Sequence, residues 1–367
     1  MNALFQQCRI GTMELRNRFV RSATNESMAE DNGAPTDALV ELYRRLSRGE
    51  VGLIISGFAY VRPRGKAVKG QLGAWDDSLI PALSRMARAV HDEGGRIALQ
   101  IVHAGAQGHV DLGQPREAPS AVEDRANGSM PEAMPIETIR SVVEDFAQAA
   151  RRAREADFDA VQVHAAHGYL FSSFLSPYCN RRDDEYGGPI ENRARIVFET
   201  CEAIRERAGS DFPLLIKINC EDFDGAGLQS EDSLWVCREL ERRGIDAIEL
   251  SGGVPAAKLN GPVRARIDRP EREAYFRDHA RRFSKQLKRP LMLVGGLRSI
   301  ETAEEILAEG AAGFFSLCRP LIREPELIQR WSLGDRSKSQ CESCNRCFSS
   351  VRERGSLQCM KIAGHAG

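Results

Sequence analysis

The sequence carries almost no net charge, because 51 lysine and arginine residues face 52 aspartate and glutamate residues among its 367 residues. A chain without a basic or acidic excess offers no general attraction for nucleic acid or for an anionic membrane, so neither is expected as a partner. No apolar run approaches the length of about 18 residues typical of a transmembrane helix. The amino-terminal segment lacks a basic stretch followed by an apolar one, so we expect no signal peptide and a cytoplasmic location.

A disulfide framework is not expected either, although the chain has 10 cysteines. Four of them, Cys341, Cys344, Cys347 and Cys359, lie within the last 27 residues. In a large cytoplasmic enzyme, clustered cysteines more often bind metal or do redox chemistry than form disulfides. Regular periodicity ends near residue 335, so the sequence predicts a domain over residues 1–335 and a cysteine-bearing tail over residues 336–367.

What the sequence does contain is a regular alternation of short apolar runs with amphipathic helical stretches. The predicted strands are Arg18–Ser22, Val51–Ser56, Arg96–Val102, Ala160–Val163, Leu214–Ile218, Ala247–Leu250, Leu291–Val294 and Gly313–Ser316. The predicted helices include Ile80–Glu93, Thr138–Glu155, Pro189–Arg207, Ser230–Arg243 and Ile300–Glu309, with helix ends near Gly49, Gly94, Gly244 and Gly310. Eight such units favour an α/β fold of the (β/α)₈ TIM-barrel type, with function in the loops after the strands. The alternative, a doubly wound sheet, would have a glycine-rich turn after its first strand, and none is present.

The densest group of chemically active side chains follows the fourth predicted strand. His164, His167 and Tyr169 come directly after the apolar run that ends at Val163. Two imidazoles three residues apart can direct two hydrogen-bond donors at one carbonyl oxygen, and a phenol can deliver a proton. A pair of structural histidines is the alternative interpretation, and a metal site there lacks a neighbouring carboxylate.

The segment from His164 to Arg193 resembles the characteristic motif of the Old Yellow Enzyme family of flavin oxidoreductases. Further matches recur in order over residues 3–330, at Leu15–Arg18, Leu99–Gly105, Ile216–Asn219, Val294–Gly296 and Ser316–Pro320. The resemblance implies an FMN-binding barrel that takes electrons from NADH or NADPH. It further implies reduction of the activated C=C bond of an α,β-unsaturated carbonyl compound, with His164 and His167 holding the oxygen and Tyr169 as proton donor.

The resemblance also implies which residues contact the cofactor. Gln100 would meet the pyrimidine edge of the flavin, and Lys217 the side on which reduction places negative charge. The other implied contacts are Ser22, Ala23, Thr24, Asn25 and Gly57 along the ring, and Gly295, Gly296, Cys318 and Arg319 at the phosphate. Without the resemblance, a simple turn at a strand end is the preferred interpretation of the glycine pair. Lys217 could be a side chain that reaches the end of the sheet, but between leucine and isoleucine residues it is costly unless paired.

Three positions depart from the family pattern. Asn25 stands where relatives often carry threonine or cysteine, so the flavin potential is expected to differ. Ala106 replaces an arginine, and Cys318 replaces a glycine. We interpret Cys318 as a small buried residue that contacts the cofactor through its main chain.

The tail resembles the cluster motif of multidomain relatives such as 2,4-dienoyl-CoA reductase and trimethylamine dehydrogenase. Four thiolates in the pattern C-x2-C-x2-C-x11-C suffice for a [4Fe–4S] cluster or for zinc, although the second spacing is one residue shorter than in those relatives. Free cysteines remain the third interpretation.

Three functions stay open on the sequence alone. The first is the FMN-dependent ene-reductase with a small-molecule substrate. The second is a flavin and iron–sulfur electron-transfer protein or a subunit similar to dienoyl-CoA reductase, and the third is a barrel lyase without flavin, which lacks a convincing Schiff-base lysine. The loops 105–135 and 253–268 are expected to choose the substrate, and Lys258, Arg264, Arg266 and Arg269 are either a solvated face or a contact for an acidic substrate. The preference for NADH or NADPH is not readable, and a homo-oligomer is the default expectation.

Overall fold

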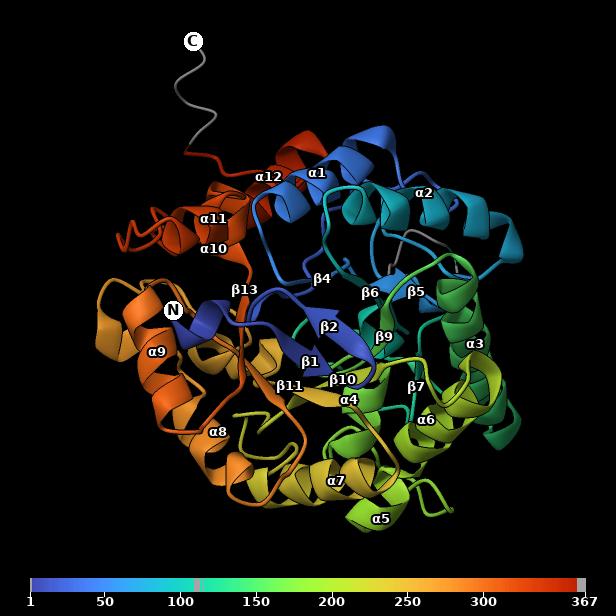
Figure 1. Cartoon of the computed structure of the whole chain (residues 1–367). Helices are drawn as coiled ribbons and strands as arrows, with labels where there is room; N and C mark the ends of the chain where they lie inside the picture. Colours follow the sequence, from blue (N-terminus) through green and yellow to red (C-terminus); the bar gives the residue numbers. More distant parts are fainter. Residues whose placement is uncertain (1, 109–112, 114, 362–367) are drawn as a thin grey trace.

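Eight parallel strands close into a barrel in the computed structural model, which describes residues 2–108, 113 and 115–361 (Figure 1). In chain order they are β3 (Phe19–Arg21), β4 (Leu53–Ile55), β6 (Ile97–Val102), β9 (Ala160–Ala165), β10 (Leu214–Asn219), β11 (Ala247–Ser251), β12 (Leu291–Val294) and β13 (Phe314–Leu317). Each pairs in parallel with the next, and the ring closes through β13 with β3 and β4 with β6. The predicted TIM barrel is therefore confirmed, and all eight predicted strands lie within two residues of their observed bounds.

Helices surround the barrel because each crossover between parallel strands must cover the outer face of the sheet. They are α1 (Asp37–Arg48), α2 (Ile80–His91), α3 (Ile136–Glu155), α4 (Leu170–Leu175), α5 (Ile190–Arg193), α6 (Arg195–Ala208), α7 (Ser230–Arg242), α8 (Arg277–Ser284), α9 (Ile300–Ala308), α10 (Arg319–Arg323), α11 (Leu327–Ser332) and α12 (Cys347–Arg354). The predicted helix over 189–207 divides at Ala194 into α5 and α6. No helix among the described residues is long and apolar enough to cross a membrane.

Glycines follow several helices, as predicted. Gly94, Gly244 and Gly310 have φ values of +70°, +81° and +69°, which favour glycine. Gly49 differs, because it follows α1 with φ −72°. The next residue, Glu50, adopts the left-handed conformation instead, with φ +65°. The reason for glycine at 49 is space, since a Cβ there would lie 2.2 Å from the carbonyl oxygen of Pro325.

A hairpin that the sequence analysis missed closes the amino end of the barrel. Its strands, β1 (Cys8–Ile10) and β2 (Met13–Leu15), pair antiparallel. They bury Ile10, Met13 and Leu15 in one apolar cluster with barrel side chains. The barrel members of this cluster include Leu53, Ala98, Leu215, Met292 and Phe314. Because the hairpin covers the amino end of the barrel, the carboxyl end of the strands is the open face on which a site can form.

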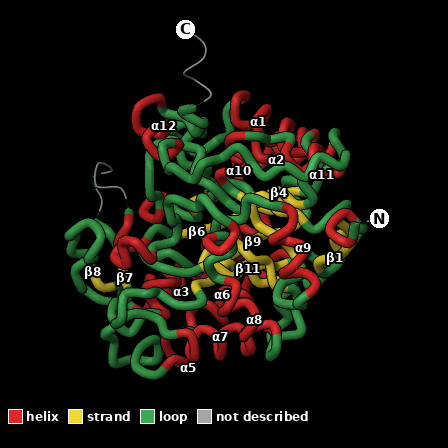
Figure 2. Tube along the Cα trace, turned by 90° about the vertical axis from the view of Figure 1, so that its left-hand side faces the viewer, coloured by secondary structure: helices red, strands yellow, loops and turns green. Residues whose placement is uncertain are grey.

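Two segments lie over that open face. The loop predicted over 105–135, of which residues 109–112 and 114 lie outside the described residues, contains the short strands β7 (Glu117–Ala118) and β8 (Glu132–Ala133), which lie away from the barrel strands in Figure 2. The tail docks back on the barrel, because Ser339 N donates to Arg298 O at 2.8 Å and Leu357 N donates to Glu26 O at 3.1 Å. The tail therefore packs against the same domain that it follows, and α12 lies at the same end of the molecule as α1 (Figures 1 and 2).

Candidate active site at the carboxyl end of the barrel

The structure brings the predicted trio of His164, His167 and Tyr169 together. His164 lies near the end of β9, and Tyr169 immediately precedes α4. The ring centroids of the two histidines are 5.2 Å apart and nearly perpendicular at 87°. The phenol ring of Tyr169 lies edge-on to His164, with the centroids 4.9 Å apart. Three groups that can donate hydrogen bonds therefore meet at one strand end.

A tight turn places these side chains. His167 has φ +63°, an uncommon value for a residue with a side chain, and Gly168 follows at φ +80°. Three side chains bond to the turn: Asn219 accepts from His167 N at 3.2 Å, Gln107 donates to His167 O at 2.8 Å, and Ser172 accepts from Gly168 N at 3.0 Å. Strained backbone at a strand end, held by several surrounding elements, is typical of a functional site.

The protonation of the trio follows from burial. Burial lowers the pKa of His164 well below 6.5, and the neighbouring His167 and the positive charge of Lys217 lower it further. Burial also lowers the pKa of His167 well below 6.5, with Lys217 again contributing. Burial raises the pKa of Tyr169 to about 12. Near neutral pH the site therefore holds two uncharged imidazoles and a protonated phenol.

Main-chain contacts also fix which nitrogen of His164 carries the proton. Ala166 N donates to Nδ1 of His164 at 3.3 Å, so Nδ1 is the acceptor and Nε2 carries the hydrogen. On the second ring, Nε2 of His167 lies 2.7 Å from Oγ of Ser251, at the end of β11.

A line of buried polar side chains crosses the barrel interior beside the histidines. Lys217 donates from Nζ to Oγ of Ser22 at 2.8 Å and lies 3.5 Å from Oε2 of Glu249. Gln162 donates to the same oxygen of Glu249 at 3.0 Å, and Gln100 donates to Oε1 of Gln162 at 2.7 Å. The predicted residues Gln100, Lys217 and Ser22 thus belong to one connected network.

A pocket of about 600 Å³, here the central pocket, opens between the ends of β3, β10, β11, β12 and β13. Its walls include Ser22, Ala23, His167, Lys217, Gly295, Gly296, Arg298, Ser316, Cys318, Arg319 and Ser343. The walls thus carry three permanent cations and no aspartate or glutamate. Within the described part of the chain, the guanidinium groups of Arg298 and Arg319 bond to main-chain carbonyls and to Asn345, but to no carboxylate.

These walls fit FMN. Guanidinium groups without a carboxylate partner are the usual partners of phosphate, and Oγ of Ser316 is buried without a hydrogen-bond partner among the described residues. Gly295 and Gly296 have φ +130° and +78°, and a Cβ at Gly296 would lie 2.9 Å from the ring of Tyr275. Glycine is therefore required here, and its bare main chain faces the central pocket.

Other predicted contact residues have partners of their own. Oγ1 of Thr24 lies 3.0 Å from Sγ of Cys318, so this half-buried thiol also contacts its surroundings through its side chain. The side chain of Asn25 accepts from Ser27 N at 3.1 Å. At Gly57, a Cβ would lie 1.9 Å from Oε2 of Glu26 and 2.8 Å from the main-chain oxygen of Thr24, so the space there already requires glycine.

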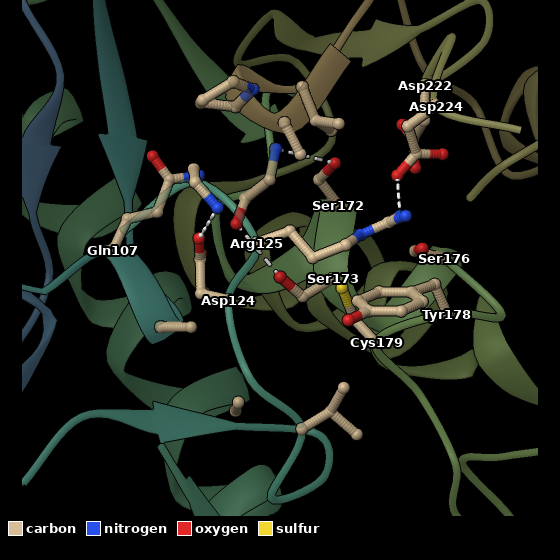
Figure 3. A pocket seen from close by; sticks show the side chains of 18 of the residues that line it. Gln107, Asp124, Arg125, Ser172, Ser173, Ser176, Tyr178, Cys179, Asp222 and Asp224 are labelled. Atoms are coloured by element: carbon tan, nitrogen blue, oxygen red, sulfur yellow. Dashed lines mark hydrogen bonds and ion pairs between the residues drawn. The ribbon is translucent and has the colours of Figure 1, made fainter. Parts of the chain in front are cut away.

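A second cavity of about 560 Å³, here the side pocket, has Gly168 in its walls, whereas the neighbouring His167 lines the central pocket (Figure 3 shows the side pocket). Hydroxyl groups of Ser172, Ser173 and Ser176 line it from α4 and the residue that follows it. Arg125 forms an ion pair with Asp224 and lies 3.8 Å from the ring centroid of Tyr178. The walls also contain Glu123, Asp124 and Asp222, so carboxylates outnumber cations, the reverse of the central pocket.

The four predicted cysteine ligands line a third cavity of about 450 Å³, here the cysteine pocket. Arg319 is part of the walls of both the cysteine pocket and the central pocket. Its guanidinium donates to Oδ1 of Asn345, between Cys344 and Cys347, at 2.6 Å. Nowhere in the described ranges do three or more His, Cys, Asp or Glu side chains lie close enough to hold a metal ion. The cysteines thus surround one space without forming a compact ligand set.

The basic residues between 258 and 269 were predicted to be either a solvated face or a contact for an acidic substrate, and Arg264 is the one of these four that is partly buried. Lys258, Arg266 and Arg269 are exposed. Arg264 is half-buried, with its guanidinium carbon 4.6 Å from the ring centroid of Tyr275 and 5.4 Å from that of Phe276.

The sequence analysis missed several residues of the site, among them Ser251, Arg298, Ser343 and Glu249. Two had a local signal. Ser251 directly follows the apolar part of β11, and Arg298 follows the Gly295–Gly296 pair by two residues. Glu249 and Ser343 had none, because only barrel closure and the docking of the tail bring them to the site.

Comparison with known proteins identifies the family. The model of the NADH:flavin oxidoreductase / NADH oxidase family matches residues 3–336. A metal reductase of Desulforamulus reducens is 34% identical over 98% of this chain, and this chain spans about half (53%) of that protein.

Two solved structures have the same fold. A complex of 2-naphthoyl-CoA reductase aligns with a TM-score of 0.91 and 28% identity, over 98% of this chain and 56% of the other. An old yellow enzyme homologue from Zymomonas mobilis aligns with a TM-score of 0.80 and 26% identity, over 98% of both chains. The chain therefore belongs to the NADH:flavin oxidoreductase / NADH oxidase family, the Old Yellow Enzyme family of FMN- and NAD(P)H-dependent oxidoreductases.

Proposed function

We propose that this chain reduces the activated C=C bond of an α,β-unsaturated carbonyl compound, with NAD(P)H as the reductant. The observation that carries the proposal is the position of the trio. Two uncharged imidazoles and a protonated phenol meet beside a pocket with three cations and no carboxylate. Such a site can hold an anionic cofactor and direct hydrogen-bond donors at a carbonyl oxygen.

The cofactor contacts proposed for FMN divide between its two ends. At the phosphate end, Arg298 and Arg319 supply charge and the main chain of Gly295 and Gly296 supplies close approach. At the ring end, Lys217 and Gln100 would meet the pyrimidine edge, and Ser22, Ala23, Thr24, Asn25 and Gly57 would lie along the ring. Bound FMN supplies hydride transfer, which no side chain can provide.

The histidines bind and polarise the substrate carbonyl. Nε2 of His164 is a hydrogen-bond donor, because Nδ1 already accepts from Ala166 N. A fixed donor directed at the oxygen on which charge develops stabilises the transition state most in a site that excludes water. His167 provides the second donor, and Ser251 fixes the plane of its ring. Burial raises the pKa of Tyr169 to about 12, so the phenol keeps its proton near neutral pH and is available to protonate the substrate α-carbon.

Anaerobic spectroscopy of the purified protein tests this proposal. We expect flavin absorption that NADH or NADPH bleaches and 2-cyclohexenone restores. Tyr169→Phe should slow reoxidation by the enone while leaving reduction by NAD(P)H unchanged. Tyr178→Phe is the matched control, because this phenol lies in the side pocket and should leave both rates unchanged. A folded protein that binds no flavin, or a reduced flavin that the enone does not reoxidise, would contradict the proposal.

The cysteine pocket supports a second candidate function, electron transfer between flavin and an iron–sulfur cluster. Cys341, Cys344, Cys347 and Cys359 surround one cavity, and Arg319 separates that cavity from the central pocket. Four cysteine thiolates are the usual ligands of a [4Fe–4S] cluster, and they also suit a single zinc ion with its four ligands about 2.3 Å from one point. A subunit-like role similar to dienoyl-CoA reductase belongs to the same candidate. Iron and sulfide analysis of anaerobically purified protein tests it, with about four irons per chain expected; zinc alone, or no metal, would contradict it.

A further inference from the structure

One buried carboxylate near the central pocket has no role in the steps above. Glu249 lies on β11, and its side chain is fully buried in the barrel interior. Strand pairing places it directly beside Lys217 on β10, with Oε2 3.5 Å from Nζ. Its other oxygen, Oε1, has no hydrogen-bond partner among the residues that the structure describes.

Stability does not explain this arrangement. Removing a carboxylate from water is costly, and a buried ion pair is often no better for stability than apolar side chains of similar volume. A buried oxygen left without a partner adds to that cost. On the opposite side of Glu249 in the sheet, β12 places the apolar Met292 in register. A charged group kept here at a cost indicates a functional reason.

The carboxylate also fixes the direction of a hydrogen-bond chain. An ionised carboxylate only accepts, so Gln162 must direct its amide nitrogen at Glu249 and its oxygen at Gln100. Gln100 must then donate its amide nitrogen to Gln162. Its own oxygen has no partner within the described part of the chain, which leaves it as an acceptor.

We propose that Glu249 is a positioning residue that lowers the reduction potential of the bound flavin. The inference rests on the proposed FMN site. Reduction adds negative charge on the side of the flavin that faces Lys217, and Glu249 offsets part of the positive charge that would stabilise it. Through Gln162 the same carboxylate fixes Gln100 as a hydrogen-bond acceptor toward the ring. One buried acid therefore controls both the charge and the hydrogen-bond polarity on this side of the cofactor.

The test is the midpoint potential of the bound flavin, measured by anaerobic spectroelectrochemistry of the full chain. Glu249→Gln removes one negative charge and should make the potential more positive. We expect the ratio of reduced to oxidised flavin at a fixed potential to rise at least about tenfold, which is about 30 mV for a two-electron couple. Glu117→Gln is the matched control: it removes another buried carboxylate, bonded to His103 in the loop over the barrel, and should leave the potential unchanged. An unchanged or more negative potential in Glu249→Gln would overturn the inference.

Two further variants keep the inference testable if Glu249→Gln does not fold. Gln162→Leu keeps the carboxylate of Glu249 but breaks the hydrogen-bond chain from Glu249 to Gln100. Its midpoint potential should therefore shift less than that of Lys217→Met, which alters the charge. Lys217→Met leaves Glu249 without its cation and should make the potential more negative; a more positive value would overturn the inference. The proposed function is tested separately, because the potential shifts are measured without any enone.

Discussion

Nε2 of His167 lies 2.7 Å from Oγ of Ser251, and this single contact joins the turn after β9 to the end of β11. Without it, the imidazole could rotate about its side-chain bonds and would no longer lie perpendicular to His164. Loss of a hydrogen bond of this kind costs about 1–3 kcal/mol when its partner is left buried and unpaired. We therefore expect Ser251→Ala to lower kcat/KM for an enone by about tenfold, as measured by steady-state kinetics. Ser251→Thr keeps the hydroxyl and should restore most of the activity; equal rates in Ser251→Ala and the wild type would exclude a positioning role.

Stability should depend on pH through the two buried histidines. Their folded-state pKa values are lowered well below 6.5, so below pH 6.5 the unfolded chain binds protons that the folded chain does not. Their contribution to stability is therefore complete above about pH 6.5 and is lost as the pH falls below it. Urea unfolding at pH 5.5, 6.5 and 7.5 should show a steeper loss in the wild type than in the variant His164→Asn/His167→Asn.

His91 provides a control of opposite sign. Its hydrogen bond to Asp159 raises its pKa, so its contribution is complete below about pH 6.5 and is lost as the pH rises through the folded-state value. His91→Asn should therefore reduce stability more at pH 5.5 than at high pH. The same pH slope in both histidine variants would contradict these assignments.

Binding of FMN should depend on a residue of the tail. Asn345 accepts from the guanidinium of Arg319 at 2.6 Å, and Arg264 O accepts from the same nitrogen at 2.8 Å. Arg319→Ala removes a charge-assisted contact worth about 1.5–3 kcal/mol, so the Kd for FMN should rise by about tenfold or more. Asn345→Ala, which only releases the guanidinium, should raise it by a smaller factor. Titration of the apoprotein by flavin fluorescence measures both, and Arg323→Ala, in the cysteine pocket alone, should leave the Kd unchanged.

A buried ion pair near the end of β3 should contribute more to the free energy of unfolding than an exposed pair does. Arg21 and Glu26 form an ion pair of 2.5 Å, both almost fully buried, and the hydroxyl of Tyr43 donates to Glu26 at 2.8 Å. Glu26→Ala leaves the guanidinium without a counter-charge and should lower the free energy of unfolding by about 3–5 kcal/mol in urea titrations. Glu41→Ala, in an exposed pair with Arg44, should cost less than about 1 kcal/mol. Similar losses in the two variants would show that burial of this pair does not matter.

The sequence predicted the barrel well because its strands are continuous apolar runs bounded by polar turns. Ile97–Val102 and Leu214–Asn219 are six-residue examples, and all their residues are buried. It did not predict the hairpin of β1 and β2, whose three-residue strands are too short to show periodicity. The helix over 189–207 was placed correctly, but its division at Ala194 leaves no trace in the pattern of apolar residues.

The candidate site was predictable where its residues are neighbours in the chain. His164, His167 and Tyr169 lie within six positions, so their proximity follows from one strand end. Ser251, Glu249 and Arg298 come from β11 and from the loop after β12, and only closure of the barrel brings them to the same place. Gly57 shows a further limit of prediction from sequence. The side chain nearest to a Cβ at this position is that of Glu26, 31 positions earlier in the chain, so no local motif indicates why glycine is needed.

The wall shared between the central pocket and the cysteine pocket has a consequence for engineering. Ser343 lines the central pocket and Asn345 holds Arg319, and both follow the point at which the periodic barrel sequence ends. A barrel trimmed at residue 335 for transplantation into another protein would therefore have an incomplete site. A fragment that keeps the candidate site whole must extend at least through Asn345. The candidate site therefore ends later in the chain than the repeated strand–helix units of the barrel.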